Sequence, residues 1–364
     1  MDVAISYCYY SYVQLTLSRY SVSCISLWRA AQDHGYIIMA MDWRGMSNYD
    51  FPIVMKTLLA QPRLFAAMRD NLIQGYANKL ALQHFSQNGL LNAEWLRFQD
   101  TELDNHRISQ AVRTYDDEVP ISVFYGSSQG GILGAGYTAL LGPTGLIDRG
   151  ILGVPGTSFS LVLSRSRSFE TYDWLMTKNF YNNRHIRLVL TVMQMGWDPV
   201  EAAGVLAPPV KERYPRMLLQ AGLGDATVPT IAAEALARAY GASTLPNNSR
   251  RIFGVPEAEP ANATWEGPYV TLTELLYEKE YTSLPVDNVY AEPNNVHFCV
   301  RQDCALIGQM AEFINTGRIM DPCLNDRCLR TNIACHVSWI KNNTKPSNWT
   351  CSANANSFQE ALEP

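Results

Sequence analysis

The sequence predicts an α/β fold in which a mainly parallel sheet is flanked by helices. Short apolar runs of strand length alternate along the chain with longer segments of helical character, a pattern typical of parallel sheets. Hydrophobic residues make up 47% of the 364 residues and charged residues 17%, so the chain can bury a large core. No internal repeat or low-complexity linker interrupts this alternation.

Five apolar runs are predicted as strands. The first follows Gly35 and ends at Asp42, and the third ends at Pro155-Gly156, residues that commonly close a strand. In chain order the predicted strands are Tyr36–Met41, Pro120–Tyr125, Leu146–Val154, Arg216–Gln220 and Arg251–Val255.

Helical segments are predicted between these strands. Trp28–His34 ends at a glycine, Val54–His84 has spaced apolar residues, and Val228–Tyr240 is rich in alanine. A further helix is expected from the glycines after residue 128 through Leu141, and the last helix at Cys304–Thr316. The polar segment 86–117 is expected to form loops with a helix near Asn92–Phe98, and residues 256–290 an acidic, proline-containing insertion.

The predicted organisation is one domain with an insertion and a tail. Residues 1–320 are expected to form the α/β domain. Within it, residues 157–212 contain no clear strand and several helical stretches, which indicates a helical lid insertion. Residues 321–364 are polar and cysteine-rich and are predicted as a C-terminal tail.

Charge and hydropathy exclude several classes of protein. The chain has 29 basic and 34 acidic side chains, a net charge of −5, and no long Lys/Arg cluster, so neither a nucleic acid nor an anionic membrane surface is indicated as a partner. The longest uncharged stretch, residues 119–147, contains Pro120 and several glycines. It is therefore expected as a buried strand, turn and helix, and no transmembrane span is predicted. No signal peptide is predicted either, because Asp2 rather than a basic residue precedes the uncharged N-terminal stretch.

The eight cysteines are unevenly distributed. Two lie near the start, and six lie in the last fifth of the chain, at Cys299, Cys304, Cys323, Cys328, Cys335 and Cys351. Glycosylation sequons occur at Asn247, Asn262, Asn342 and Asn348. Together they favour disulfides and a secreted or extracytoplasmic protein. The alternatives are free thiols in a cytoplasmic protein, or a zinc site over Cys323–His336, which lacks a paired CxxC spacing.

The pentapeptide Gly126-Ser127-Ser128-Gln129-Gly130 follows a predicted strand and precedes a predicted helix. A sharp strand-to-helix turn of this G-x-S-x-G type projects the middle serine, and the flanking glycines avoid collisions with neighbouring backbone. Ser128 is therefore the candidate nucleophile. The alternative is a glycine-rich loop carrying an ordinary serine.

A serine nucleophile needs a base, and the base needs an orienting carboxylate. Asp225 follows a predicted strand and precedes a predicted helix, a place where an aspartate can also be a helix N-cap. Only His297 and His336 lie downstream of it. His297 is expected in a loop directly before the last helix, whereas His336 lies in the tail. The chain order therefore favours Ser128, Asp225 and His297.

At this point the chain resembles the α/β-hydrolase superfamily. The resemblance covers roughly residues 25–318 and includes a D-x-R-G-x-x-S turn at Asp42–Ser47, the Ser128 turn, the Asp225 turn and the position of His297. It implies an ester, thioester or amide substrate of small-molecule or acyl type, and an acyl-enzyme on Ser128. It also implies an oxyanion donor at the Gln129 N–H, and neither cofactor nor metal.

The lid position of residues 157–212 is implied by the same resemblance. Its large apolar residues could line an acyl site or could simply be core. They are Trp174, Phe180, Tyr181, Met193, Met195 and Trp197.

The N-terminal end departs from the family pattern. The second oxyanion donor would fall around Gln14–Ser21, yet no glycine occurs before Gly35, and there is no room ahead for the first two strands of the family. Either another loop supplies the donor, or the N-terminal strands are missing. Two functions follow: a serine hydrolase, or a non-catalytic relative that binds a ligand or partner through an incomplete oxyanion hole.

Overall fold

The structure is a computed structural model. It describes residues 3–7, 37–59, 61–89, 97–99, 108–110, 121–180, 182–206, 215–246, 248–258, 270–277, 293–301 and 303–322. Predictions for Trp28–His34, for residues 14–21 and 207–212, for the sequons, and for the tail from residue 323 lie outside the described residues.

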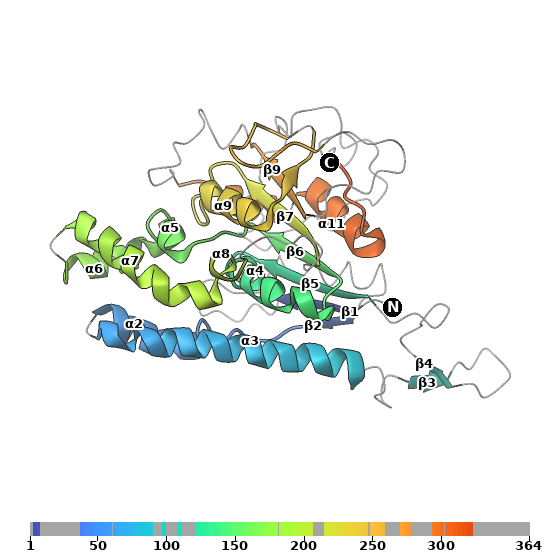
Figure 1. The fold of residues 1–364 in the computed structure, drawn as a ribbon, viewed down its shortest axis with the longest axis horizontal. Coiled ribbons are helices and arrows are strands. Elements are labelled where there is room, and N and C mark those ends of the chain that lie inside the picture. The colour runs from blue at the N-terminus through green and yellow to red at the C-terminus, as the bar shows by residue number, and fades with distance from the viewer. Residues whose placement is uncertain are drawn as a thin grey trace, which may run out of the picture.

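A seven-stranded parallel sheet forms the centre of the described chain (Figure 1). Its strand order is β2-β1-β5-β6-β7-β9-β8, and all neighbouring strands pair in parallel. The strands are β1 Val3–Tyr7, β2 Ile37–Met39, β5 Ser122–Ser127, β6 Arg149–Gly153, β7 Arg216–Gly222, β8 Ser243–Thr244 and β9 Val270–Leu275. The predicted α/β architecture is therefore confirmed.

The helices lie between and beside these strands. They are α2 Phe51–Leu59, α3 Phe65–Asn88, α4 Gln129–Leu141, α5 Phe159–Leu163, α6 Glu170–Thr177, α7 Asn183–Trp197, α8 Ala202–Val205, α9 Thr230–Tyr240, α10 Val296–Val300 and α11 Cys304–Thr316. Short 3-10 turns occur at η1 Asn48–Asp50, η2 Pro62–Leu64, η6 Gly142–Thr144, η7 Arg167–Phe169 and η8 Asp198–Val200. The predicted helix over Val54–His84 is divided between α2 and α3, because Pro62 has no N–H to continue the first helix.

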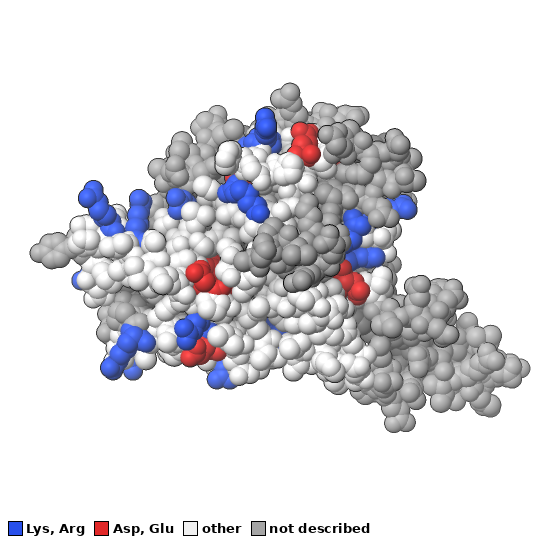
Figure 2. All heavy atoms as spheres, viewed as in Figure 1, with Lys and Arg blue, Asp and Glu red and all other residues white. Residues whose placement is uncertain are grey.

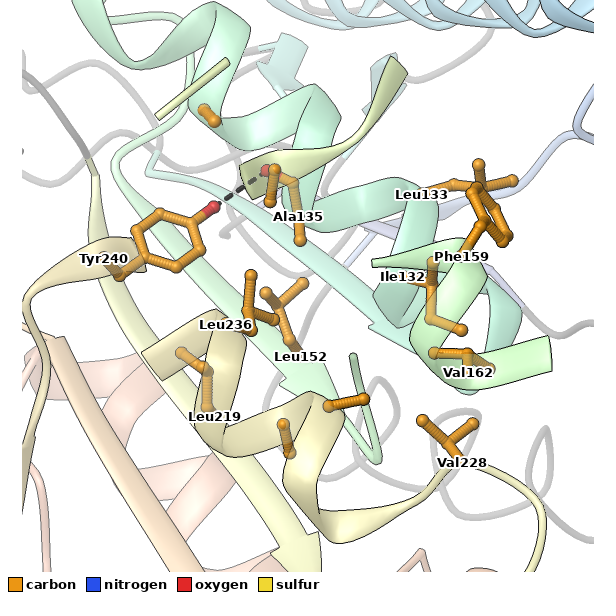
Figure 3. Packing of buried hydrophobic residues seen from close by; sticks show 14 of the residues in the cluster. Ile132, Leu133, Ala135, Leu152, Phe159, Val162, Leu219, Val228, Leu236 and Tyr240 are labelled. Carbon is orange, nitrogen blue, oxygen red and sulfur yellow. Dashed lines mark hydrogen bonds between the residues drawn. The ribbon is translucent and has the colours of Figure 1, made fainter. Parts of the chain in front are cut away.

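Successive residues of the strands pack on opposite faces of the sheet. In β5, Phe124 joins a core with α4 and α9, whereas Val123 and Tyr125 join a core with α11. In Figure 3, Tyr240 of α9 reaches α4, and its hydroxyl donates to the Ala135 carbonyl at 2.8 Å. Helices therefore cover both faces, and the strand ends remain available for a site.

The last sheet strand differs from the prediction. Arg251–Val255 is not a strand, since it contains a turn at Gly254 with φ +73°. The strand is instead β9, inside the segment 256–290 that was expected to be an insertion. Thr271, Thr273 and Glu274 of β9 are buried. These polar side chains break the apolar run that marks a buried strand, so the pattern did not reveal it.

Two further strand regions also differ. Val3–Tyr7 was not predicted as a strand, yet it enters the sheet between β2 and β5. In the part of the chain that the structure describes, β2 is an edge of the sheet. The helix expected near Asn92–Phe98 is wrong at its end, because β3 Arg97–Gln99 pairs antiparallel with β4 Ile108–Gln110.

The lid segment is helical as predicted, from α5 to α8. Figure 1 shows α5, α6 and α7 gathered on the same side of the molecule as α2, away from α11. None of the described helices combines the length and the apolarity needed to cross a bilayer.

Lys79 of α3 is buried beside the turn that follows β2. Its Nζ donates to the Met41 carbonyl at 3.2 Å and lies 4.2 Å from the centroid of the Trp43 ring. Burial lowers the pKa of Lys79 from 10.5 to about 6, and the nearby Asp42 carboxylate opposes this shift. At neutral pH the folded protein therefore favours the neutral amine.

This lowered pKa makes stability depend on pH. Between pH 6 and 10.5 the unfolded chain binds a proton at Lys79 that the folded chain does not, so the unfolding free energy rises with pH across that window. We expect Lys79→Met to reduce this rise, measured by urea unfolding between about pH 7.5 and 9.5. Equal pH slopes in the variant and the wild type would contradict the assignment.

Candidate active site

Ser128 occupies a strained turn between β5 and α4. Its backbone has φ +58° and ψ −123°, a conformation that a non-glycine residue rarely adopts. Gly126 is needed here, because a Cβ at that position would lie 2.2 Å from the Gly130 carbonyl oxygen. The Ser128 N–H donates to the Gly153 carbonyl at 2.8 Å, which fixes the turn against β6. The predicted strand–turn–helix context of Ser128 is therefore present.

The three predicted catalytic side chains lie in series. His297 Nε2 is 2.9 Å from Ser128 Oγ, and His297 Nδ1 is 2.7 Å from Asp225 Oδ2. Asp225 and His297 are buried. With the proton on Nδ1, the imidazole donates to the carboxylate and its Nε2 can accept the Ser128 hydroxyl proton. Residues from three separate parts of the chain thus form one hydrogen-bonded series.

The Asp225 carboxylate is held by its own turn after β7. Its Oδ1 accepts hydrogen bonds from the Thr227 and Val228 N–H groups at 2.7 and 3.0 Å. The other oxygen, Oδ2, faces His297. The two oxygens therefore have separate tasks, one anchoring the side chain and the other orienting the imidazole.

His297 lies on the short helix α10 rather than in the loop that the sequence predicted. Helix α10 packs closely on β7, because a Cβ at Gly222 would lie 2.3 Å from Val296 Cγ1. Asn294, just before the helix, donates from Nδ2 to the Gly224 carbonyl at 2.9 Å and so ties the histidine segment to the acid turn. The other histidine considered as a base, His336, lies outside the described residues.

Gln129 is the first residue of α4 and directly follows Ser128. The N–H groups in the first turn of a helix have no carbonyl acceptor within that helix, and the Gln129 N–H is one of them. The group can therefore donate to an oxyanion formed next to Ser128. The second donor expected around residues 14–21 lies outside the described residues.

A cavity of about 260 Å³ opens at Ser128 and Gln129 and extends between α2, α3 and the lid helices. Most of its lining side chains are apolar. They include Met46, Phe51, Val54, Met68, Ile132, Phe159, Val162, Phe169, Tyr172, Leu190, Met193, Trp197 and Val228. Four of these, Ile132, Phe159, Val162 and Val228, lie near one another in Figure 3. The site therefore offers a carbonyl-attacking group beside an apolar chamber.

Of the large apolar lid residues named from the sequence, some line the cavity and others do not. Met193 and Trp197 line the cavity, and Trp197 packs edge-on against Phe65 with ring centroids 4.9 Å apart. Trp174 and Met195 are instead exposed on the outer surface. Phe180 packs against the core without lining the cavity, and Tyr181 lies outside the described residues.

A partly buried polar network fixes the base of the lid. Gln194 of α7 accepts a hydrogen bond from the Ser160 N–H at 3.0 Å, donates to Asp198 at 2.9 Å and also donates to Glu201. Burial raises the pKa of Glu201 from 4.5 to about 7, although the Gln194 hydrogen bond opposes the shift. The network joins α5, α7 and the segment before α8.

The D-x-R-G-x-x-S turn lies at the cavity, which Met46 and Ser47 line, rather than in the Ser128–His297–Asp225 series. Asp50 Oδ2 accepts from the Gly45 N–H at 2.7 Å, the Ser47 N–H at 3.0 Å and the Ser47 hydroxyl at 2.6 Å. Gly45 has φ +96°, and a Cβ there would lie 2.8 Å from the Leu72 nitrogen. Asp50 thus holds the loop that presents Ser47 to the cavity, a role that the sequence motif alone did not reveal.

Arg301 also lies at the site, although no motif in the sequence marks it. It caps α10 one turn after His297, and its guanidinium lies 5.1 Å from the Phe298 ring centroid. Burial lowers the pKa of Arg301, while the nearby Tyr125 and Asp225 oppose the shift. The Arg301 guanidinium therefore places a positive charge near Asp225.

The described residues contain no group of three or more His, Cys, Asp or Glu side chains arranged to hold a metal ion. Cys299 is disulfide-bonded. The alternative zinc site over Cys323–His336 lies outside the described residues.

A comparison with protein-family models found no match, and a comparison with curated protein sequences also found none.

Proposed function

We propose that this chain is a serine hydrolase of the α/β-hydrolase superfamily that cleaves an ester, thioester or amide through an acyl-enzyme on Ser128. The observation that carries the proposal is the series Ser128–His297–Asp225, with contacts of 2.9 and 2.7 Å. The strained turn at Ser128 and the chain order Ser, Asp, His support it further.

The proposed reaction begins with attack of Ser128 Oγ on the substrate carbonyl. His297 Nε2 takes the hydroxyl proton, and Asp225 stabilises the resulting imidazolium and keeps the ring in position. The Gln129 N–H donates to the oxyanion of the tetrahedral intermediate. His297 then returns the proton to the leaving alcohol, thiol or amine as the bond to it breaks. Water enters and repeats the steps, which releases the acid and restores Ser128.

The cavity supports a substrate with an apolar acyl group. Its lining offers apolar side chains from the lid and from α2 to α4, while Ser47, Ser166, Ser168 and Thr227 supply a few hydroxyls. Such a chamber stabilises an acyl chain by burying its methylenes, at about 0.8 kcal/mol for each. The disulfide at Cys299 supports the further proposal of a secreted or extracytoplasmic location.

We expect the protein to hydrolyse p-nitrophenyl esters, with a higher kcat/KM for medium-length acyl chains than for acetyl because of the apolar cavity. A fluorophosphonate, which phosphonylates activated serines, should abolish this activity in a time-dependent manner. Absence of both turnover and inactivation would contradict the proposal and favour the alternative of a non-catalytic ligand-binding or partner-binding protein.

A further inference from the structure

Helix α7 is apolar on two opposite faces. Its inner face places Leu190, Met193 and Trp197 at the cavity. Its outer face carries Leu188, Val192 and Met195 at positions i, i+4 and i+7, with exposed fractions of 62%, 60% and 76%. Residues with this spacing lie along one side of a helix. A helix at the surface of a globular protein normally has a polar outer side. The exposed apolar residues of α7 therefore indicate that its outer face contacts an apolar surface.

The neighbouring helix α6 adds an aromatic and a cationic group. Trp174 is 57% exposed, and Lys178 Nζ lies 3.8 Å from its ring centroid. Tryptophan and lysine each combine an apolar body with a polar end, and both residues are favoured at membrane interfaces.

Two cations, Lys178 and Arg184, lie beside this stripe, whereas the acidic Glu170 and Asp173 are in the first turn of α6. Helix α7 has no acidic residue in its first turn, and Arg184 lies there although cations are unfavourable at the positive end of a helix dipole. Neither Arg184 nor Lys178 forms an ion pair with a described residue. In Figure 2, blue side chains project from the lobe at the left, where Figure 1 places α6 and α7, and the red atoms lie nearer the middle.

We propose that the outer face of α6 and α7, defined by Trp174, Leu188, Val192 and Met195 with Lys178 and Arg184, docks on an anionic lipid surface. The apolar stripe inserts at the level of the headgroups, and the two cations contact lipid phosphates. Two cations beside one stripe are too few to appear as a basic cluster in the composition. The folding of α6 and α7 is what places these two cations beside the apolar stripe.

The test is flotation of the Ser128→Ala protein with phosphatidylcholine vesicles that contain or lack phosphatidylglycerol. This variant keeps the outer face of α6 and α7 and cannot consume the vesicle lipids through Ser128, so lipid binding is measured whether or not the proposed hydrolysis is correct. We expect flotation with the anionic vesicles that weakens as salt is added. In this background, Leu188→Ser/Val192→Ser/Met195→Ser should lower the partition coefficient at least about tenfold. Lys178→Gln/Arg184→Gln should lower binding to anionic vesicles about fivefold for each cation.

The matched controls are Phe253→Ser and Arg251→Gln, which change an exposed aromatic and an exposed cation outside α6 and α7 and should leave flotation unchanged. Near-ultraviolet circular dichroism should show that every variant keeps its fold, as expected for changes at exposed positions. The proposal is overturned if the Ser128→Ala protein does not float. It is also overturned if the variant that adds Leu188→Ser/Val192→Ser/Met195→Ser floats as well as Ser128→Ala alone. A third contradicting result would be a dimer in sedimentation that Leu188→Ser/Val192→Ser/Met195→Ser dissociates, because the outer face would then contact a second copy of the chain.

Discussion

Replacement of Ser128 by alanine should lower kcat for ester hydrolysis by about 10⁶-fold, to the level left by binding and oxyanion contacts alone. The variant removes the only atom that accepts the acyl group in the proposed reaction, while Asp225 and His297 keep their hydrogen bond. The hydrogen bond from the Ser128 N–H to the Gly153 carbonyl, which fixes the turn, involves only backbone atoms, so the fold should persist.

The matched control is Ser127→Ala. Ser127 precedes the nucleophile in β5 and is buried, so this substitution tests whether loss of any serine hydroxyl at the turn affects the rate. Its kcat should stay within a few-fold of the wild type. If Ser128→Ala kept a tenth or more of the wild-type rate with its fold intact, another nucleophile would have to be sought.

Asp225→Asn should lower kcat/KM by about 10⁴-fold without unfolding the protein. The reason lies in the different partners of the two carboxylate oxygens. The Thr227 and Val228 N–H groups require an acceptor where Oδ1 lies, so the amide oxygen should occupy that position. The amide NH₂ then faces His297 Nδ1, which must become an acceptor. The proton is forced onto Nε2, and the imidazole can no longer accept the Ser128 proton.

A buried aspartate outside the Ser128–His297–Asp225 series provides the control. Asp303 caps α11, accepting from the Ala305 N–H at 2.9 Å and from the Tyr277 hydroxyl at 3.2 Å. Asp303→Asn should lower the unfolding free energy by about 1 kcal/mol and leave kcat/KM near the wild-type value. Comparable loss of kcat/KM in both variants would mean that Asp225 acts through stability alone.

The site could be predicted from the sequence because its requirements are local. Ser128 needs a particular turn between a strand and a helix, and the glycines of that turn are visible as a pattern. Asp225 and His297 could then be assigned by chain order, since Asp225 follows a sheet strand and His297 precedes the last helix. The helical state of the His297 segment was not predicted, because α10 is too short to show a periodic pattern.

The parts that could not be predicted depend on tertiary contacts. Strand β9 is buried although it contains Thr271, Thr273 and Glu274, and its sheet neighbours rather than its own composition stabilise it. The inner and outer residues of the lid could not be separated, because Met193 and Met195 differ only in which side of α7 they occupy. Asp50 is likewise recognisable only from the three hydrogen bonds that converge on it.

If Ser128 is an activated nucleophile, a reagent that labels such serines should form a covalent adduct on it, and the position of this adduct can be measured. The protein would be treated with a fluorophosphonate, weighed intact by mass spectrometry, digested and sequenced by fragmentation, alongside Ser128→Ala and heat-denatured protein. We expect one adduct for each wild-type molecule, located on Ser128, and none in either control. An adduct on another residue, or equal labelling of Ser128→Ala, would show that Ser128 is not the activated nucleophile.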